Sequence, residues 1–241
     1  MKLLIDAGNT RIKWALLAGE EWSHLTTVPV AQIAAFSEMV ARLPAVGAVW
    51  VSNVAGAEVA QHIRSACESR GWQPEFIVAQ KRQCGVHNGY TAAGQLGSDR
   101  WAALIAAWHR TGKSALVVNC GTATTIDALS DRGEFLGGLI LPGIALMQSS
   151  ISDTAALLQQ TVGKYAAHPL NTADAILSGA LQATCGAIQR QYDLLGGAGT
   201  TVLLSGGAAQ PLRELLQVPV EHAADLVLQG LKLIAQEASA S

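Results

Sequence analysis

The chain has 241 residues, of which 50% are hydrophobic and 14% are charged, and its formal net charge is −2. This composition is typical of a compact protein of one or two domains and argues against disorder. No basic run indicates a nucleic-acid partner, and no apolar run has the length of a membrane span, so we expect small-molecule partners, no nucleic acid and no membrane. The four cysteines lack CxxC or other metal-ligand spacing, which favours free thiols in a reducing cytoplasm.

The N-terminal segment has one lysine and an apolar run that Asp6 interrupts, which is too short for a signal-peptide core and predicts a buried strand. Hydrophobic periodicity then predicts alternating elements through the first half. The expected strands are 2–7, 10–17, 22–28, 46–52 and 75–79, and the expected helices are 30–43, 57–70 and 98–111. Residues 80–97 lack both periods and are rich in Gly, Asn and Gln, which predicts a long loop, and such a loop in a compact domain is usually functional or disordered.

The second half repeats this style of elements, and no Pro- or Ser-rich linker separates the halves. The expected strands are 114–119, 123–129, 134–141, 200–204 and 218–221, and the expected helices are 143–160, 172–194, one from 207 and one from 223. We therefore predict an α/β fold of two halves, residues 1–112 and 113–241, each with a mixed sheet flanked by helices.

A short internal repeat supports this division. Residues 3–16 read LLIDAGNTRIKWAL, and residues 116–129 read LVVNCGTATTIDAL. Combined with the matching order of elements, the repeat predicts duplicated halves that face each other across a ligand cleft. At an offset of 113 residues, the shared residues are Leu3/Leu116, Gly8/Gly121, Ala15/Ala128 and Leu16/Leu129.

The first hairpin turn, DAGNT, has features of a phosphate site. Gly8 allows a tight turn and the close approach of a ligand to exposed N–H groups, and Asn9 and Thr10 add short polar side chains. Asp6 could hold a hydrated Mg²⁺ carried by the phosphates, and Lys13 could add positive charge. Taken alone, the five residues are more typical of an ordinary Asp/Gly/Asn hairpin turn.

Two further glycine turns occur in the second half. Residues 120–125, CGTATT, join a glycine turn to hydroxyl side chains, so this loop and the first could hold a nucleotide's phosphates from both sides. Gly206 and Gly207 would let a flat adenine or ribose lie against the backbone, although a plain strand-to-helix turn has the same sequence. The chain has no GxxxxGK(S/T) and no GxGxxG, which argues against P-loop and Rossmann sites.

Residues 96–108, LGSDRWAALIAAW, offer a candidate catalytic helix start. Ser98 is suited as an N-cap, and the helix dipole and free N–H groups favour a charged Asp99 in the first turn. Arg100 offers a forked cation for a substrate carboxylate, and the preceding loop delivers Asn88 and Tyr90. An ionised Asp99 is a weak base, but the hydroxyl proton leaves late in phosphoryl transfer, so orientation matters more than basicity. An ordinary capped helix is the alternative interpretation.

At these residues the sequence resembles the type III pantothenate kinases, also called the Bvg accessory factor family, within the acetate and sugar kinase/Hsc70/actin superfamily. The resemblance covers almost the whole chain, through DAGNTRIKW, NGY, LGSDR, GTATTID, GGLILPG, NTADAILSG and SGG in this order. It implies duplicated ribonuclease H-like (actin-like ATPase) halves with a cleft between them. It also implies phosphorylation of pantothenate by ATP with Mg²⁺, the first step of coenzyme A synthesis, by a cytoplasmic homodimer that depends on K⁺ or NH₄⁺.

Residue by residue, the resemblance makes Asp99 the general base and Asp6 the carboxylate that binds Mg²⁺ through the phosphates. The implied pantothenate-binding residues are Tyr90, Gly97, Ser98, Asp99, Arg100 and, reaching the substrate of the neighbouring subunit, Thr172. The implied ATP-binding residues are Asp6, Ala7, Gly8, Asn9, Thr10, Arg11 and Lys13 in the first loop, Gly121, Thr122, Ala123 and Thr124 in the second, and Gly206 and Gly207 in the third.

Asn119 departs from the family pattern, because many relatives have there an Asp that is associated with the monovalent cation. Asn keeps an oxygen ligand without the charge, so the site either binds K⁺ more weakly or dispenses with it. Two other functions stay open: a related small-molecule kinase with the same phosphate loops, and an ATP-binding regulatory or accessory protein without turnover. Asn119 is the only support for the regulator, whereas Asp6 and Asp99 both favour an enzyme.

Overall fold

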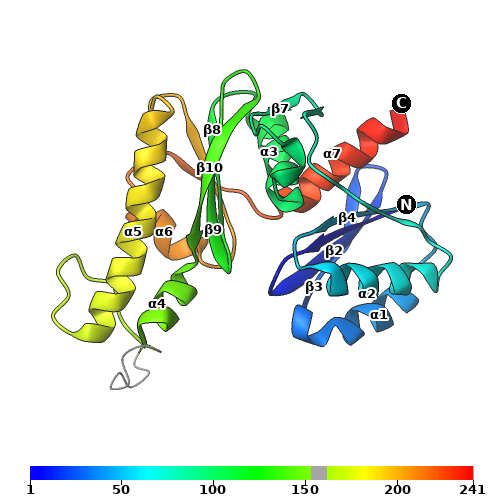
Figure 1. The fold of residues 1–241 in the computed structure, drawn as a ribbon, viewed down its shortest axis with the longest axis horizontal. Helices are drawn as coiled ribbons and strands as arrows, with labels where there is room; N and C mark the ends of the chain where they lie inside the picture. The colour runs from blue at the N-terminus through cyan, green and yellow to red at the C-terminus, as the bar shows by residue number, and fades with distance from the viewer. Residues whose placement is uncertain (153–161, 241) are drawn as a thin grey trace. The chain divides into compact units, whose positions relative to one another are not determined.

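The computed structural model describes residues 1–152 and 162–240, and the chain divides into two compact units (Figure 1). The first unit comprises Met1–Arg110 together with Asp225–Ser241, and the second comprises Thr111–Ala224. The boundary after residue 110 lies close to the one expected from the sequence. The residues from 225 onward, which we expected in the second half, return instead to the first unit.

The first unit is built on a five-stranded sheet with the order β3-β2-β1-β4-β5. β1, β2 and β3 are antiparallel neighbours, whereas β4 and β5 run parallel to β1. The strands are β1 (Lys2–Ala7), β2 (Arg11–Ala18), β3 (Glu21–Pro29), β4 (Ala48–Asn53) and β5 (Pro74–Phe76), followed by a hairpin of β6 (Arg82–Gln83) and β7 (Val86–Asn88). The helices are η1 (Val30–Gln32), α1 (Ile33–Ala41), α2 (Ala57–Glu68), η2 (Ala93–Gln95), α3 (Ser98–Thr111) and α7 (Leu226–Ala240).

Alternation along β1 gives this sheet two different faces. Leu3, Ile5 and Ala7 are fully buried in a core that includes side chains of α1 and α2. Lys2 points the other way, because its Nζ donates a hydrogen bond to the carbonyl of Ala235 in α7 at 2.7 Å. Asp6 follows Lys2 by an even number of residues, so its side chain lies on the same face of the strand, which α7 covers.

The last helix closes this face of the first unit. A Cβ at Gly230 would collide with the carbonyl of Ala102, so the glycine lets α7 lie directly against α3. Lys232 of α7 also forms an ion pair with Glu20, in the turn between β2 and β3. The helix is therefore fixed both to α3 and to the edge of the sheet.

The strands of the second unit follow the order β12-β11-β8-β9-β10. On one face, Leu116, Val118 and Cys120 form a core with Leu181 and Ile188 of α5. The strands are β8 (Ala115–Cys120), β9 (Ala123–Leu129), β10 (Glu134–Pro142), β11 (Thr201–Ser205) and β12 (Val220–His222), and the helices are α4 (Ile144–Ser152), α5 (Thr172–Leu194) and α6 (Ala209–Leu215).

The two units repeat one strand topology, in which β1 to β5 correspond in order to β8 to β12. Asp6 and Asn119 are each the last residue but one of the first strand in their unit. The backbone contacts after this strand also match, because the N–H of Val54 bonds to the carbonyl of Ala7 at 3.0 Å and the N–H of Ala208 bonds to that of Cys120 at 3.2 Å. The duplication predicted from the sequence is therefore present in the fold.

The residue alignment of the repeat is nevertheless wrong after the glycine turn. Ala7 pairs with Ile12 across the first turn, whereas its equivalent Cys120 pairs with Thr124, so the second turn is one residue shorter. The offset changes from 120 − 7 = 113 to 124 − 12 = 112 at this point. Two identities are therefore out of register in the structure: Ala15/Ala128 and Leu16/Leu129.

Two other segments differ from the sequence prediction. The expected loop 80–97 contains the β6–β7 hairpin and η2, and the expected helix 30–43 is divided into η1 and α1. The described part of α4, Ile144–Ser152, lies within the expected helix 143–160, and the rest of that helix lies outside the described residues. In the described part of the chain, no helix combines the length and the apolar character needed to cross a membrane.

Candidate active site

A row of polar side chains crosses the sheet of the first unit. Asp6 on β1 pairs with Lys13 on β2 and with Ser52 on β4. Paired residues on neighbouring strands point to the same face, here the face that α7 covers. Ser52 is fully buried, while Asp6 and Lys13 are half-buried. The end of β1 therefore presents a carboxylate next to an ammonium group.

Asp6 carries a carboxyl group that is difficult to ionise in the free protein. Burial is the largest cause, the charges of Asp99 and Asp225 add to it, and Lys13 acts in the opposite direction. Together they raise the pKa of Asp6 from 3.8 to about 7. Because three carboxylates influence one another here, an added cation would lower their mutual repulsion. A divalent ion that arrives with phosphates fits this site, since Mg²⁺ then needs only one or two protein carboxylates.

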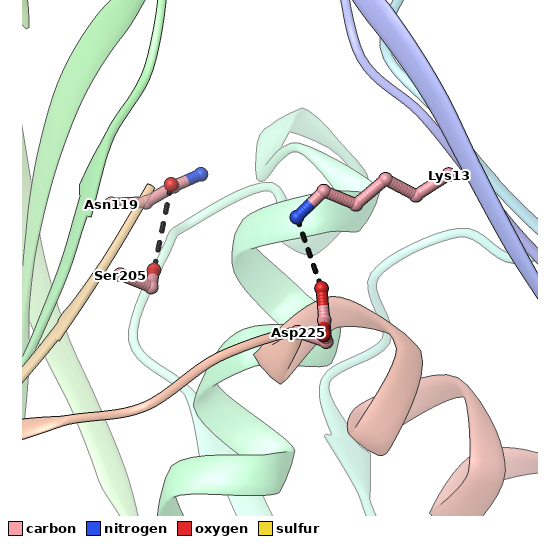
Figure 2. Close-up of polar contacts among 4 residues, drawn as sticks. All are labelled: Lys13, Asn119, Ser205 and Asp225. Carbon is pink, nitrogen blue, oxygen red and sulfur yellow. Dashed lines mark hydrogen bonds and ion pairs between the residues drawn. The ribbon is translucent and has the colours of Figure 1, made fainter. Parts of the chain in front are cut away.

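Lys13 is held by Asp225, which the sequence analysis did not single out (Figure 2). The Lys13 Nζ lies 3.0 Å from the Asp225 Oδ1. Asp225 immediately precedes α7, and its carbonyl accepts the N–H of Gln229 at 3.0 Å. Its backbone is left-handed, with φ of 55°, a conformation that non-glycine residues other than Asn and Asp rarely adopt. In the sequence, the position of Asp225 immediately before the apolar run of α7 was the one feature that could have indicated it, because Asp often precedes the start of a helix.

A buried hydrogen bond fixes the start of α3 to β4. The hydroxyl oxygens of Ser98 and Ser52 lie 2.9 Å apart. Asp99 follows in the first turn of α3, and its Oδ1 accepts the N–H of Arg100 at 2.8 Å. A Cβ at Gly97 would lie only 2.7 Å from the same Oδ1, so the glycine makes room for this carboxylate. The predicted residues of the LGSDR segment are thus brought together by contacts that include Ser52.

The pKa of Asp99 contradicts our expectation from the helix start. Asp99 is half-buried, and burial raises its pKa above 3.8 by more than the N–H and charge of Arg100 lower it. The expectation that the helix start on balance favours the charged form of Asp99 is therefore wrong, because desolvation outweighs the helix start. A carboxyl with a raised pKa is better matched to accepting a proton near neutral pH.

Arg100 and Tyr90 form a second predicted pair beside Asp99. Arg100 is buried, its Nη1 donates to the Tyr90 hydroxyl at 3.3 Å, and its guanidinium lies 5.9 Å from the centre of the Tyr90 ring. The N–H of Tyr90 donates to Asn88 Oδ1 at 3.0 Å. The loop that we expected to be functional therefore lies against α3. Its position leaves a cation and a phenol next to the candidate base.

The first glycine turn is closed and accessible. The N–H of Gly8 donates to the carbonyl of Arg11 at 3.1 Å, and the N–H of Val30 donates to the carbonyl of Thr10 at 2.9 Å. Asn9, Thr10 and Arg11 are exposed. The turn thus offers short polar groups at the end of β1, as predicted for a phosphate loop.

An equivalent polar row crosses the sheet of the second unit. Asn119 on β8 pairs with Thr125 on β9 and with Ser205 on β11. The Ser205 hydroxyl lies 3.5 Å from the Asn119 Oδ1 (Figure 2). The three residues stand where the first unit has Asp6, Lys13 and Ser52, so the row keeps its geometry and loses its charges.

Thr124 does not belong to this row, although the sequence assigned it to the second phosphate loop. It is fully buried, and alternation along β9 places it with Ile126 on the core side of the sheet. Its Oγ1 has no hydrogen-bond partner within the described part of the chain. The shorter turn is the reason, because it brings Thr125 rather than Thr124 to the face of Asn119.

The second and third glycine turns meet within the second unit. Gly121 and Thr122 are exposed after β8. Gly206 follows β11 with φ of 94°, and a Cβ there would collide with the backbone of Cys120. Gly207 is exposed, with open space where its Cβ would be. The close approach of the two turns requires glycine at position 206. The contact of this turn with adenine or ribose stays a prediction.

Thr172 lies elsewhere in the second unit, as the exposed first residue of α5. Asn171 caps this helix by accepting the N–H of Asp174 at 2.9 Å. The contact of Thr172 with the substrate of a neighbouring subunit stays a prediction.

Sequence reasoning missed three residues of these rows and the partner of Lys13, because strand register or the return of α7 makes them neighbours of residues that are distant in sequence. Lys13 and Asp225, for example, are 212 positions apart. Among the described residues, no group of three or more His, Cys, Asp or Glu side chains has the arrangement of a metal site. The missed residues are Ser52, Thr125, Ser205 and Asp225.

Residues 2–194 match the family model of the type III pantothenate kinases. The chain is 46% identical to the type III pantothenate kinase of Aromatoleum aromaticum, with all of both chains covered. It is 45% identical to that of Nitrosospira multiformis, covering 98% of this chain and 92% of the relative.

Solved structures share the fold at low sequence identity. A Campylobacter jejuni protein described as a Baf family transcriptional activator has a TM-score of 0.64 and 24% identity, covering 99% of this chain and 100% of that one. The polyphosphate/ATP-glucomannokinase of Arthrobacter sp. strain KM has a TM-score of 0.52 and 15% identity, covering 98% of each. The fold is thus the duplicated α/β fold of the actin-like kinases. By its family-model match and its full-length identities, the chain belongs to the type III pantothenate kinase family.

Proposed function

We propose that the protein transfers the γ-phosphoryl group of ATP to the hydroxyl group of pantothenate, giving 4′-phosphopantothenate, the first step of coenzyme A synthesis. The names of its full-length relatives support the substrate. The observation that carries the proposal is the pair of half-buried carboxyls Asp6 and Asp99, whose charges interact within one unit. Two carboxyls with different partners can divide the work, one on the phosphate side and one as proton acceptor.

Asp99 is the proposed general base. Its pKa is raised by burial, so it has a greater affinity for the hydroxyl proton than an exposed aspartate has. The hydrogen bond from the N–H of Arg100 fixes the carboxylate, and the Ser98–Ser52 contact fixes the helix that carries it. Because the proton leaves late in phosphoryl transfer, this orientation contributes as much as the pKa does.

Arg100 and Tyr90 are the proposed contacts of pantothenate. The substrate has a carboxylate, and a guanidinium can bind such a group through two parallel hydrogen bonds. Tyr90 supports the guanidinium from below and limits its rotation. The other proposed substrate contacts are Gly97, Ser98 and Thr172.

The nucleotide is assigned to the three glycine turns. The turns at Gly8 and Gly121 offer exposed short polar side chains to phosphates, and Gly207, in the third turn, offers open backbone to the nucleoside. Lys13 adds a positive charge beside Asp6. Mg²⁺, when bound, would neutralise charge on the phosphate oxygens, and Asp6 is the residue that would hold it.

The uncharged row in the second unit affects how strongly a monovalent cation can bind. Asn119, Thr125 and Ser205 supply oxygen atoms without a negative charge. We therefore propose that K⁺ or NH₄⁺ binds here only weakly, or that the enzyme works without it. The proposal rests on the charge of this row, since a carboxylate in place of Asn119 would add to the attraction for a cation.

We also propose a cytoplasmic homodimer. Leu146 and Ile151 on α4 are 49% and 48% exposed. Ile151 also lines an apolar groove of about 460 Å³ between α4 and α5. Exposed apolar side chains gathered in this way are typical of an interaction surface. The four cysteines are free thiols, as is usual in a reducing compartment.

The decisive experiment is ADP release with MgATP in the presence and absence of pantothenate, for wild type and Asp99→Asn. We expect pantothenate-dependent turnover that falls by about 10²- to 10⁴-fold in the variant, because a general base is lost. Nucleotide binding and the melting temperature should stay close to wild type. A fully active Asp99→Asn would remove Asp99 from the mechanism.

The same assay separates the remaining functions. Turnover with sugars, acetate or polyphosphate but not with pantothenate would identify a related kinase. ATP binding without turnover on any acceptor would identify a regulatory protein. A comparison of KCl with a salt of a large organic cation, at fixed ionic strength, tests the neutral row, because a steep rise with KCl would show that the cation is required despite Asn119.

A further inference from the structure

The ion pair between Lys13 and Asp225 has no part in the reaction as proposed so far. It joins β2 to the residue before α7, with 39% of the Lys13 side chain and 25% of the Asp225 side chain exposed. A partly exposed pair contributes little to stability. The left-handed backbone at Asp225, with φ of 55°, has a cost of comparable size. Global stability therefore does not account for the pair.

The position of Lys13 suggests a different reason. It is the strand neighbour of Asp6 and lies two residues after the first glycine turn. A lysine side chain is long and flexible, so fixing its ammonium group at a phosphate has an entropic cost. A partner that already holds the ammonium near the correct place reduces this cost.

Asp225 is well suited to be that partner, because its own position is fixed. Its carbonyl is bonded to the N–H of Gln229 in the first turn of α7. α7 in turn is seated on α3 at Gly230 and on the β2–β3 turn through Lys232. The Asp225 carboxylate therefore provides a rigid anchor opposite a flexible cation.

We propose that Asp225 is a positioning residue that holds the Lys13 ammonium beside Asp6 before the nucleotide binds, so that the phosphate chain of MgATP meets a preoriented cation. This inference rests on the proposed function, in which Lys13 contacts the phosphates. It assigns the effect of Asp225 to nucleotide affinity, and it assigns none to pantothenate. If Asp225 acted only through its negative charge, its removal would instead favour the anionic nucleotide.

The test compares the Lys13–Asp225 pair, just before α7, with the Lys232–Glu20 pair, whose lysine lies within α7. Asp225→Asn removes the carboxylate charge from Lys13, and Asn tolerates the left-handed backbone. Glu20→Gln, the matched control, removes the charged partner of Lys232, far along α7 from the Asp225 end. We expect Asp225→Asn to raise KM for MgATP about fivefold or more, within the range for directly coupled residues, and to leave KM for pantothenate within about twofold. Glu20→Gln should leave both constants within about twofold.

The Lys13→Met variant shows whether the effect of Asp225 on nucleotide affinity depends on Lys13. In this variant, adding Asp225→Asn should cause no further loss of nucleotide affinity. Titration calorimetry with a non-hydrolysable ATP analogue and Mg²⁺ measures this affinity without turnover. An unchanged or lowered KM for MgATP in Asp225→Asn, or an equal loss in the Lys13→Met background, would overturn the inference. If Asp225→Asn does not fold, Asp225→Gly, which accepts the same φ, replaces it with the same expected results.

Failure of the inference and failure of the proposed function give different results. Wild type that neither binds the analogue nor turns over pantothenate would contradict the proposed function itself. Wild type that does both, together with an unaltered Asp225→Asn, would contradict only the role of Asp225.

Discussion

At Asp6 a carboxylate lies beside the Lys13 ammonium on the next strand, whereas at Asn119 an amide lies beside the Thr125 hydroxyl. The second unit therefore lacks both the negative charge of Asp6 and the positive charge of Lys13. A carboxylate at position 119 would have no cation beside it on either neighbouring strand of its row, since Ser205 is the other neighbour. Asn avoids the cost of an unpaired, partly desolvated charge. Asn119 is thus consistent with its local surroundings.

The raised pKa of Asp6 predicts a pH dependence of stability in the absence of nucleotide. Its pKa is about 7 in the folded chain and 3.8 without the fold. Between these values the folded state retains a proton that the unfolded state has lost, so stability falls as pH rises through this window. Above pH 7 both states are ionised, and the full cost of the buried charge remains.

Asp6→Asn should remove this cost. For a carboxyl that is only half-buried we expect about 1 to 2 kcal/mol, discounted for solvent screening. The variant should therefore melt roughly 3 to 6 °C above wild type at pH 8, and the difference should shrink toward pH 4. Asp131→Asn, in the exposed turn before β10, is the control and should show no such trend. A difference between Asp6→Asn and wild type that is constant from pH 4 to 8 would contradict the electrostatic cause.

Among the elements, the turn after β11 is tightly constrained by a single residue. Gly206 has a left-handed φ and no room for a Cβ, whereas its neighbour Gly207 has open space. We expect Gly206→Ala to destabilise the protein by about 2 kcal/mol and to weaken nucleotide binding, because the turn must move away from Cys120. Gly207→Ala should change stability by less than about 0.5 kcal/mol. Urea unfolding and analogue titration of both variants measure this contrast, and equal effects would show that the turn is not rigid.

Strands and turns were predictable where local pattern determines them. The apolar run of β1 and the glycines of the three turns indicated these elements correctly. The register of β9 was not predictable, because a turn shorter by one residue moves every following side chain to the other face of the sheet. This single residue exchanged the places of Thr124 and Thr125.

The candidate site was predictable only where its residues are neighbours in sequence. Asp99, Arg100 and Tyr90 belong to one segment, and its motifs identified them. Ser52 and Asp225 depend on contacts that only the complete fold creates, so no local pattern indicated their partners. The direction of the Asp99 pKa was wrong for the same reason, because sequence shows the helix start but not the burial around it.

At the scale of the whole molecule, the exposed apolar surface of α4 predicts self-association. Ile151→Asp places a charge in this surface, where burial against a partner would desolvate it. We expect the dimer dissociation constant to rise at least about tenfold, which light scattering over a concentration series would detect. Leu25→Asp, at a 55% exposed position in the first unit, is the control. An Ile151→Asp protein that remains as dimeric as the control would place the interface elsewhere.

The return of α7 to the first unit has a consequence for the order of events during protein synthesis. The second unit is continuous in sequence, from residue 111 to 224, and holds its own sheet and core, so it can form as soon as that stretch has left the ribosome. The first unit begins to emerge earlier, yet the sheet face that carries Asp6 stays uncovered until residues 225–240 have been made. Lys13 therefore has no Asp225 to contact until almost the whole chain has been translated. The phosphate side of the site is assembled last.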